Sequence, residues 1–435
     1  VVEGDMVNEG YLISHPSSGY RLSVDLWKDL ENKGVWAPYQ TTFEAVTNQQ
    51  ISQASDKKFE GYFAKSDSLG QVVLGSDVVF NNNTFDLAKS TLNTNGHLLQ
   101  TIDYKLQNGK IASEDRMLLE NSILAQLSFS GNYKLDGKIR IQYGIVFKGN
   151  TTLLDTLHND TYYNTTLVVE GDMVNEGYLI SHPSSSYRLR VDLWSDLENK
   201  GIWAPYQTTF KAVTDQQISQ ASGKKFEGYF TKSDSLGQVV LGSDVVFDNN
   251  TFDLAKSTLN TNEHLLQSNN YSFSNGKIWC NDTVFFNDTK LSGITAKGNF
   301  VLKGKVRIQN YNTFEGIVTL ADSLFNDTYY NSTLKISGNL INEGYLINKP
   351  SGYRLSLSIN GNIENNKHLS IQTIYLTGSN ERSIGGKNVN GIEAAFYVDD
   401  SIVLTGSNTL PNLNFTSNPE AGCLVKEGAV LNIRS

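Results

Sequence analysis

The sequence predicts an all-β protein: an elongated, mostly parallel β-solenoid, similar to a right-handed β-helix, built from tandem 167-residue units. Three observations lead to this fold class. The chain repeats itself at a long fixed period, a shorter motif recurs inside each unit, and short runs with an apolar residue at every second position end in Asn, Gly or Asp. Short coils that stack on one another produce such a pattern.

The long period divides the chain into repeats. Residues 1–100 recur as 168–267 without a gap and with ten substitutions, and residues 101–167 match 268–334 more weakly in the same register. A third copy opens at Lys335, loses one residue near 350–352 and then diverges. We therefore distinguish repeat 1 (1–167), repeat 2 (168–334) and a partial, divergent repeat 3 (335–435).

A finer period lies inside each repeat. Val2–Gly10 is echoed by Leu26–Gly34, and Leu376–Asn380 recurs as Leu404–Asn408. Strands of about five residues that recur every 20 to 28 residues fit the coils of a solenoid. We expect Asn side chains at the turns to stack into ladders along such coils.

The local pattern indicates strands and tight turns. Apolar residues alternate with period two, as in strands, and Asn-Gly pairs such as Asn108-Gly109 supply the positive φ of a turn. The only stretch with helical character, 114–127, has a counterpart at 281–293 that lacks the pattern, so we expect no helix. The alternative architecture is a string of β-sandwich domains. Recurrence of one motif at coil spacing favours the solenoid.

Composition restricts the partners. The formal net charge is −9 with a pI of about 5.3, and no basic cluster occurs, which argues against nucleic acid and anionic membranes as partners. No apolar run approaches the ~20 residues of a membrane helix, so we expect no membrane insertion in this segment. Only Cys280 and Cys423 are present, and they form no disulfide framework or Cys-based metal site.

An aromatic loop is the best candidate for ligand binding. Trp36-Ala37-Pro38-Tyr39 recurs as Trp203-Ala204-Pro205-Tyr206. Flat rings stack on sugar faces and a proline stiffens the loop, so Trp36, Tyr39, Trp203 and Tyr206 are candidate glycan-stacking residues. The alternative interpretation is that Trp36 packs over the end of a coil.

Catalytic and metal sites have less support. The nearest acidic cluster is Asp25, Asp29 and Glu31, and repeat 3 has lost two of these three acids, which indicates a solvated strand face. Cofactors are predicted to be absent. Calcium is the one ion for which the sequence offers oxygen ligands, and the candidates are Asp77, Asp86, Asp244 and Asp253. Their spacing matches neither an EF-hand nor the glycine-rich calcium repeat.

Asn- and Gly-punctuated segments such as Ile336–Leu346 and Ile402–Asn408 resemble the coils of bacterial cell-surface or secreted β-helix proteins of the adhesin or filament type. The resemblance implies a parallel solenoid, extracellular display at the cell surface and adhesion, with no catalytic residues. We therefore expect a non-catalytic structural or adhesive segment, a stalk, fibre or adhesin, of a larger surface protein. The alternatives are a glycan-binding module that uses the Trp36 and Trp203 loops, and a glycan-active β-helix enzyme.

The partners follow from this interpretation. Val1 lies inside a strand motif, and alternation continues through Ala429–Ile433, so we expect both ends of the solenoid to be covered. The covering partner would be further repeats of the same polypeptide or neighbouring copies stacked end to end. Glycans and a host or neighbouring cell surface are the other expected partners.

The predicted coil spacing sets a length. Some 18 coils of about 24 residues, each rising about 4.8 Å, would stack to roughly 85 Å. Small-angle scattering should therefore give an elongated particle. A compact particle, with the radius of gyration of ~22 Å expected for a globular chain of this length, would contradict the solenoid.

Overall fold

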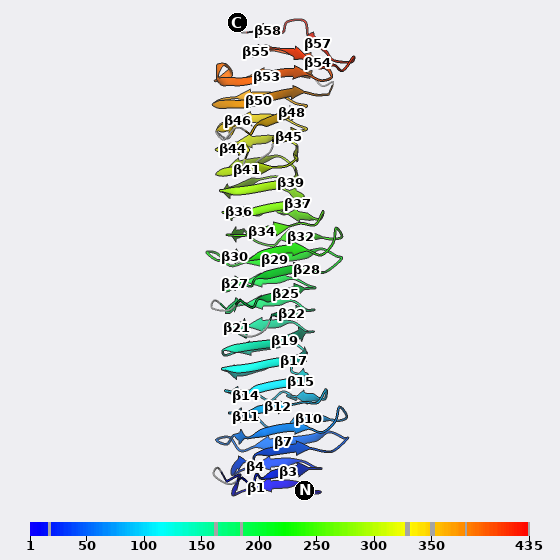
Figure 1. Ribbon diagram of the computed structural model, residues 1–435, viewed down its shortest axis with the longest axis vertical. Helices are drawn as coiled ribbons and strands as arrows, with labels where there is room; N and C mark the ends of the chain where they lie inside the picture. The colour runs from blue at the N-terminus through cyan, green and yellow to red at the C-terminus, as the bar shows by residue number, and fades with distance from the viewer. Residues whose placement is uncertain are drawn as a thin grey trace. The chain divides into compact units, whose positions relative to one another are not determined.

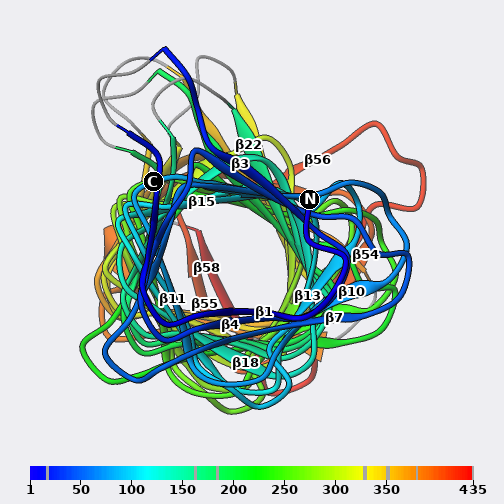
Figure 2. The same ribbon diagram turned by 90° about the horizontal axis from the view of Figure 1, so that it is seen from below.

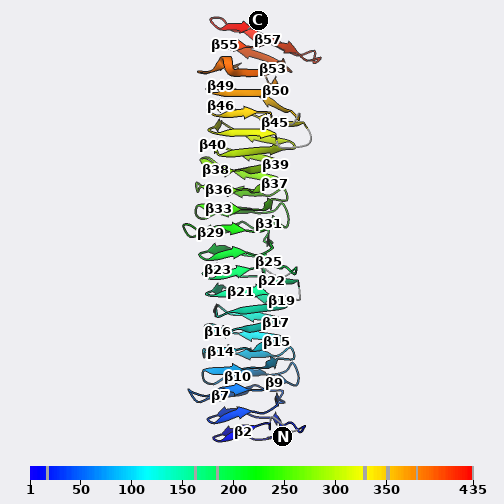
Figure 3. The ribbon, with the colours of Figure 1, turned by 60° about the vertical axis from the view of Figure 1, so that its left-hand side comes forward.

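The computed structural model describes residues 1–15, 19–160, 164–182, 186–326, 331–348, 353–378 and 381–433. These residues form an all-β parallel β-solenoid of about 19 turns, which confirms the fold class predicted from the sequence (Figures 1 and 3). The coils fall into two compact units, an N-terminal unit, Val1–Ala212, and a C-terminal unit, Val213–Ser435. Among the described residues, no helix has the length and apolar character needed to span a membrane.

Each coil of the N-terminal unit contributes strands to three faces, and every strand pairs in parallel with those of the neighbouring coils. The first face contains β1 (Met6–Asn8), β4 (Leu30–Asn32), β7 (Gln49–Gln53), β10 (Gln71–Leu74), β13 (Thr91–Asn93), β22 (Thr165–Val169), β25 (Leu189–Leu193) and β28 (Gln207–Phe210). The second contains β2 (Tyr11–Ile13), β5 (Val35–Ala37), β8 (Phe59–Glu60), β11 (Val78–Asn81), β14 (Leu99–Ile102), β16 (Arg116–Glu120), β18 (Tyr133–Asp136), β20 (Thr151–Leu153), β23 (Met173–Asn175) and β26 (Leu197–Asn199).

The third face of the N-terminal unit joins the first through three long strands. It contains β3 (Ser23–Leu26), β6 (Gln40–Phe43), β9 (Tyr62–Lys65), β12 (Thr84–Asp86), β21 (Thr156–Asn159), β24 (Tyr178–Ile180) and β27 (Ile202–Ala204). The long strands serve both faces: β15 (Lys105–Ala112), β17 (Ser122–Ser130) and β19 (Ile139–Phe147). Asn108, in the predicted Asn-Gly turn, bends β15 with a φ of 60°.

The C-terminal unit is built in the same way, and Figure 2 views the coils along the direction in which they stack. Its strands are β29 (Gln216–Gln220), β30 (Phe226–Glu227), β31 (Tyr229–Lys232), β32 (Gln238–Leu241), β33 (Val245–Asp248), β34 (Thr251–Asp253), β35 (Thr258–Asn260), β36 (Leu266–Asn269), β37 (Ser272–Trp279), β38 (Thr283–Asn287), β39 (Thr289–Lys297), β40 (Phe300–Lys303), β41 (Lys305–Gln309), β42 (Asn312–Glu315), β43 (Val318–Leu320), β44 (Ser323–Asn326), β45 (Ser332–Ile336), β46 (Leu340–Asn342), β47 (Tyr345–Ile347), β48 (Leu355–Ile359), β49 (Ile363–Asn365) and β50 (His368–Leu376).

The last described coils of the C-terminal unit contain the one helical segment among the described residues, a single 3-10 turn, η1 (Val389–Gly391). Their strands are β51 (Glu381–Arg382), β52 (Ile384–Gly385), β53 (Ile392–Val398), β54 (Ser401–Leu404), β55 (Ser407–Leu410), β56 (Asn414–Phe415), β57 (Gly422–Val425) and β58 (Val430–Ile433). Two short ladders, β51-β54-β57 and β55-β58, run beside the main sheet. The stretch 114–127 forms β16 and part of β17, so the absence of a helix there is confirmed.

Alternation places one side of each strand in the interior. In the N-terminal unit, Trp36, Phe59 and Phe80 lie over one another on the second face, and Phe63 and Phe85 do so on the third, all with no exposed surface. The rings meet edge-on or tilted, with centroids 5.2–6.4 Å apart. Burial of these side chains, at about 25 cal/mol per Å² of apolar surface, is the main stabilising term of the coils.

Coil length varies more than the sequence suggests. Met6 stacks on Leu30, whereas Val24 stacks on Thr41, a clearly shorter interval of sequence. The predicted spacing therefore describes only the longer coils, because the corners differ in length. The echo of Leu376 in Leu404 is not a stacking relation: Leu376 pairs with Val398, and Leu404 pairs with Arg382. Residues 379–380 of that echo lie outside the described residues.

The 167-residue repeat is not a whole number of coils. Eight successive pairings on the third face lead from β3 to β24, and the repeat 2 copy of β3 is β25, the next strand along the chain. In the same way, β4 on the first face recurs as β26 on the second, and β5 on the second recurs as β27 on the third. Within the N-terminal unit, each copied strand thus lies one face further round the solenoid.

The predicted asparagine ladder is present as buried pairs. Asn8 Nδ2 donates to Asn32 Oδ1 over 2.8 Å, and the same bond joins Asn175 to Asn199 and, over 2.7 Å, Asn342 to Asn365. Asn32 has no exposed surface; its Oδ1 also accepts from the Gly34 N–H, and its Nδ2 donates to the Lys58 carbonyl. The side chain thus satisfies backbone groups that lie away from water.

We predict that Asn32→Ala lowers the free energy of unfolding by about 1–3 kcal/mol, because buried groups lose their partners. Urea denaturation followed by circular dichroism would measure this loss. Asn83→Ala is the control, since Asn83 is exposed and should change stability by no more than about 0.5 kcal/mol. Equal midpoints for the two variants would contradict a stabilising role for the asparagine pair.

Candidate functional site

The structure separates the residues of the predicted aromatic loop. Trp36 and Trp203 have no exposed surface, and their Nε1–H groups donate to Thr41 Oγ1 and Thr208 Oγ1, each over 3.0 Å. This differs from the exposed stacking rings that the sequence predicts. Alternation along β5 explains the difference, because Val35 points outward and Trp36 inward. Neither indole has a face open to a ligand.

The two tyrosines of these loops lie at the surface instead. Tyr39 is 43% exposed and Tyr206 is 37% exposed. An arginine covers one face of each ring: the Arg21 guanidinium carbon is 4.0 Å from the Tyr39 centroid, and that of Arg188 is 3.9 Å from the Tyr206 centroid. Each tyrosine therefore retains at most one ring face for stacking.

The carboxylates proposed as calcium ligands are engaged in contacts between or within coils. Asp77 Oδ1 accepts from the Leu98 N–H over 2.9 Å, and Asp86 Oδ2 accepts from Gln107 and Asn108 over 2.8 and 2.9 Å. In repeat 2, Asp244 accepts from the Leu265 N–H and Asp253 from the Ala255 N–H and Asn275. No group of three or more His, Cys, Asp or Glu side chains suited to a metal occurs in the described part of the chain.

The acidic cluster near the start of repeat 1 is similarly occupied. Asp29 Oδ1 accepts from the Gln50 N–H over 2.7 Å, and Glu31 pairs with Lys33 at 3.2 Å. Asp25 is half-buried on β3. These contacts are those of a solvated strand face, with one hydrogen bond to the next coil and one ion pair within the coil.

A surface hollow of about 850 Å³, which we call the corner groove, follows one corner of the N-terminal unit. Loops after β9 and β12 form one side, and its floor is the bends of β15, β17 and β19, where Asn108, Gln126 and Tyr143 take φ of 52–60°. Gly109 is required beside this floor, because a Cβ there would lie 2.4 Å from Leu87 Cβ. The lining residues are Ser66, Asp67, Ser68, Asp86, Ala88, Lys89, Asn108, Gly109, Lys110, Gln126, Leu127, Ser128, Gly144 and Val146.

The two carboxylates of the corner groove both accept hydrogen bonds from the protein. The pKa of Asp67 is lowered, chiefly by the Leu69 N–H and also by the Lys65 ammonium, which is buried and donates over 3.2 Å. Asp86 accepts two amide hydrogen bonds, as described above. A general acid requires a raised pKa, and the shift at Asp67 is in the opposite direction.

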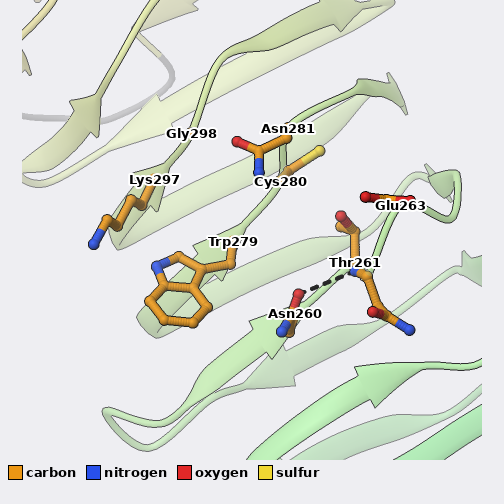
Figure 4. Close-up of a pocket in the computed structure, with 9 residues that line it drawn as sticks. Asn260, Thr261, Glu263, Trp279, Cys280, Asn281, Lys297 and Gly298 are labelled. Carbon is orange, nitrogen blue, oxygen red and sulfur yellow. Dashed lines mark hydrogen bonds between the residues drawn. The ribbon is translucent and has the colours of Figure 1, made fainter.

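A second hollow, which we call the Trp279 pocket, lies in the C-terminal unit and holds about 390 Å³. Figure 4 shows Trp279 and Lys297 extending from neighbouring strands, with Glu263 at the turn of the coil before them. The ring of Trp279 is 38% exposed, and Lys297 Nζ lies 5.2 Å from its centroid. Cys280 lines the pocket but is buried, and burial raises the pKa of its thiol. Sequence reasoning missed Trp279, although one signal was available: the equivalent residue of repeat 1 is Ala112.

The comparisons with known proteins give no relative. No family model matches the chain, and neither curated proteins nor solved structures give a match. The function must therefore be argued from the chain itself.

We predict that Trp36→Ala lowers the free energy of unfolding by about 3–5 kcal/mol, because it leaves a cavity in the core and an unpaired Thr41 hydroxyl. Trp203→Ala should behave alike. Thermal denaturation measures both against Trp27→Ala, a control at a tryptophan that is 47% exposed. Wild-type stability in Trp36→Ala would show that the indole does not support the core.

Proposed function

We propose that this chain is a non-catalytic structural and adhesive segment, displayed outside the cell as part of a surface or filament protein. The observation that carries the proposal is the interior of the coils, which stacked apolar side chains and buried Asn pairs fill in the described part of each unit. A scaffold of this kind holds surface groups at spacings fixed by the coil rise of about 4.8 Å.

The surface chemistry agrees with this proposal. Charged groups pair within a coil and between neighbouring coils: Lys200 contacts Glu198 of its own coil at 3.0 Å and Glu176 of the preceding coil at 3.6 Å. The pKa of Lys200 is raised by these carboxylates, Glu198 first, so its ammonium group stays protonated at neutral pH. Such exposed pairs contribute little stability each, and they give the coils a polar exterior.

The partners we propose are glycans or another cell surface, together with further coils of the same kind. Residues of five successive coils line the corner groove, and four of these coils contribute hydroxyl, amide or charged side chains beside apolar ones. A groove that crosses several coils suits an extended polymer better than a compact ligand. Glycan-active catalysis is the competing function, and the hydrogen-bonded carboxylates of the groove argue against it.

The test is to apply the purified chain to polysaccharide-coated and protein-coated surfaces and to assay the same polymers for new reducing ends. We expect retention on at least one surface with no increase in reducing ends above the buffer control. Polymer cleavage that scales with protein concentration would contradict the proposal, and so would failure to adhere to any surface.

A further inference from the structure

The Trp279 pocket spans the same corner of three successive coils. Asn260, at the end of β35, pairs with Trp279 at the end of β37, which pairs with Lys297 at the end of β39. Because Ile278 points into the core, the period of two directs Trp279 outward. The indole thus projects from the strand ladder between the Asn260 amide and the Lys297 ammonium group (Figure 4).

Some polar side chains of the pocket form no hydrogen bond or ion pair within the described residues. Asn260 and Asn262 are engaged, since Asn260 Oδ1 accepts from the Asn262 N–H over 3.0 Å and Asn262 Nδ2 donates to the Leu241 carbonyl over 3.3 Å. By contrast, within the described residues the indole N–H of Trp279, the amide of Asn281 and the carboxylate of Glu263 make no hydrogen bond or ion pair. The Lys297 ammonium likewise has no such partner there and lies over the indole ring. Donors, acceptors and one ring therefore border the same 390 Å³ hollow without protein partners.

This set of groups matches the chemistry of a sugar. A pyranose presents C–H groups that pack on an aromatic ring and hydroxyls that pair with amides, an indole N–H and a carboxylate. The charges of Lys297 and Glu263 offset each other, and the chain as a whole carries −9, so the site does not favour a polyanion. The volume lies within the range of small-ligand pockets.

We propose that the Trp279 pocket binds one pyranose unit of a neutral polysaccharide, with the indole as the stacking surface and Asn281, Glu263 and Lys297 as its hydrogen-bonding partners. This inference rests on the proposed adhesive function and makes it specific. It assigns the ligand contact to an aromatic residue outside the repeated loops.

Repeat 1 provides an internal comparison. The coil position of Trp279 is occupied there by Ala112, which pairs with Asn93 and Ser130 as Trp279 pairs with Asn260 and Lys297. Gly96 replaces Glu263 and Glu114 replaces Asn281, and Glu114 accepts from the Asn132 N–H over 3.1 Å. The same backbone ladder thus forms with alanine at this position, so Trp279→Ala should leave the fold intact.

The experiment is affinity electrophoresis of the full chain in gels that contain a soluble neutral polysaccharide (β-glucan, xyloglucan or galactomannan) or alginate as the anionic comparison. We expect at least one neutral polymer to retard the wild-type chain, with alginate weaker. Trp279→Ala should weaken that binding by about tenfold or more, the loss expected for a stacked ring. Trp27→Ala, at an exposed tryptophan on another corner, should bind like wild type.

Two results would overturn the inference: no retardation by any neutral polymer, or equal retardation of wild type and Trp279→Ala, with matching thermal denaturation to show that both are folded. In either case, retention of the wild-type chain on a coated surface without cleavage would leave the proposed adhesive function standing. New reducing ends in the polymer would instead contradict the adhesive proposal itself.

Discussion

The backbone ladder between neighbouring coils is the interaction on which the rest of the structure depends. Parallel strands cannot pair within one coil, so the N–H and C=O groups of each strand find partners only in the coils before and after it. Once that ladder is formed, side chains one coil apart must lie over one another. The aromatic column of Trp36, Phe59 and Phe80 and the pair of Asn8 and Asn32 are both consequences.

The corners are free of this constraint, and they account for the variation along the chain. A corner needs only to return the chain to the next face, so it tolerates insertion at little cost. The corner between the third and first faces differs from coil to coil. After β9 it is a projecting loop, whereas in β17 it is a single bent residue, Gln126. The corner groove forms because coils with a projecting loop and coils with a bent residue at this corner lie within a few coils of each other.

This division explains how much the sequence could predict. The solenoid, its strands and its asparagine pairs follow from alternation and from the short echo inside each repeat, and the structure confirms them. Coil length could not be read in the same way, because corner residues carry no periodic signal. Trp36 lies in a strand and not in the exposed loop that the nearby Pro38 suggests. The 24-residue echo places it over Leu12 within the ladder. Alternation along that strand would have turned the indole inward.

The Trp279 pocket carries no signal in the residues that the two repeats share. Shared residues in a stack of coils are mainly those that the ladder and the core require, and Trp36 and Trp203 belong to that class. Trp279 differs from Ala112 at a position where both backbones are the same, so folding does not require it. In a duplicated chain, a bulky outward residue found in one copy is therefore a stronger indication of binding than a shared one.

The shift of each copied strand by one face concerns how such a chain can lengthen. With β15, β17 and β19 each counted twice, twenty-five strand positions separate β3 from β25, which is eight coils of three strands and one strand more. The duplicated segment is therefore a whole number of modules, each a strand with its corner, and not a whole number of closed coils. Insertion of any whole number of such strand-and-corner modules still lets every strand pair with strands of the neighbouring coils. Successive copies then place equivalent outward side chains on neighbouring faces, so a surface that approaches one face meets different side chains from each copy.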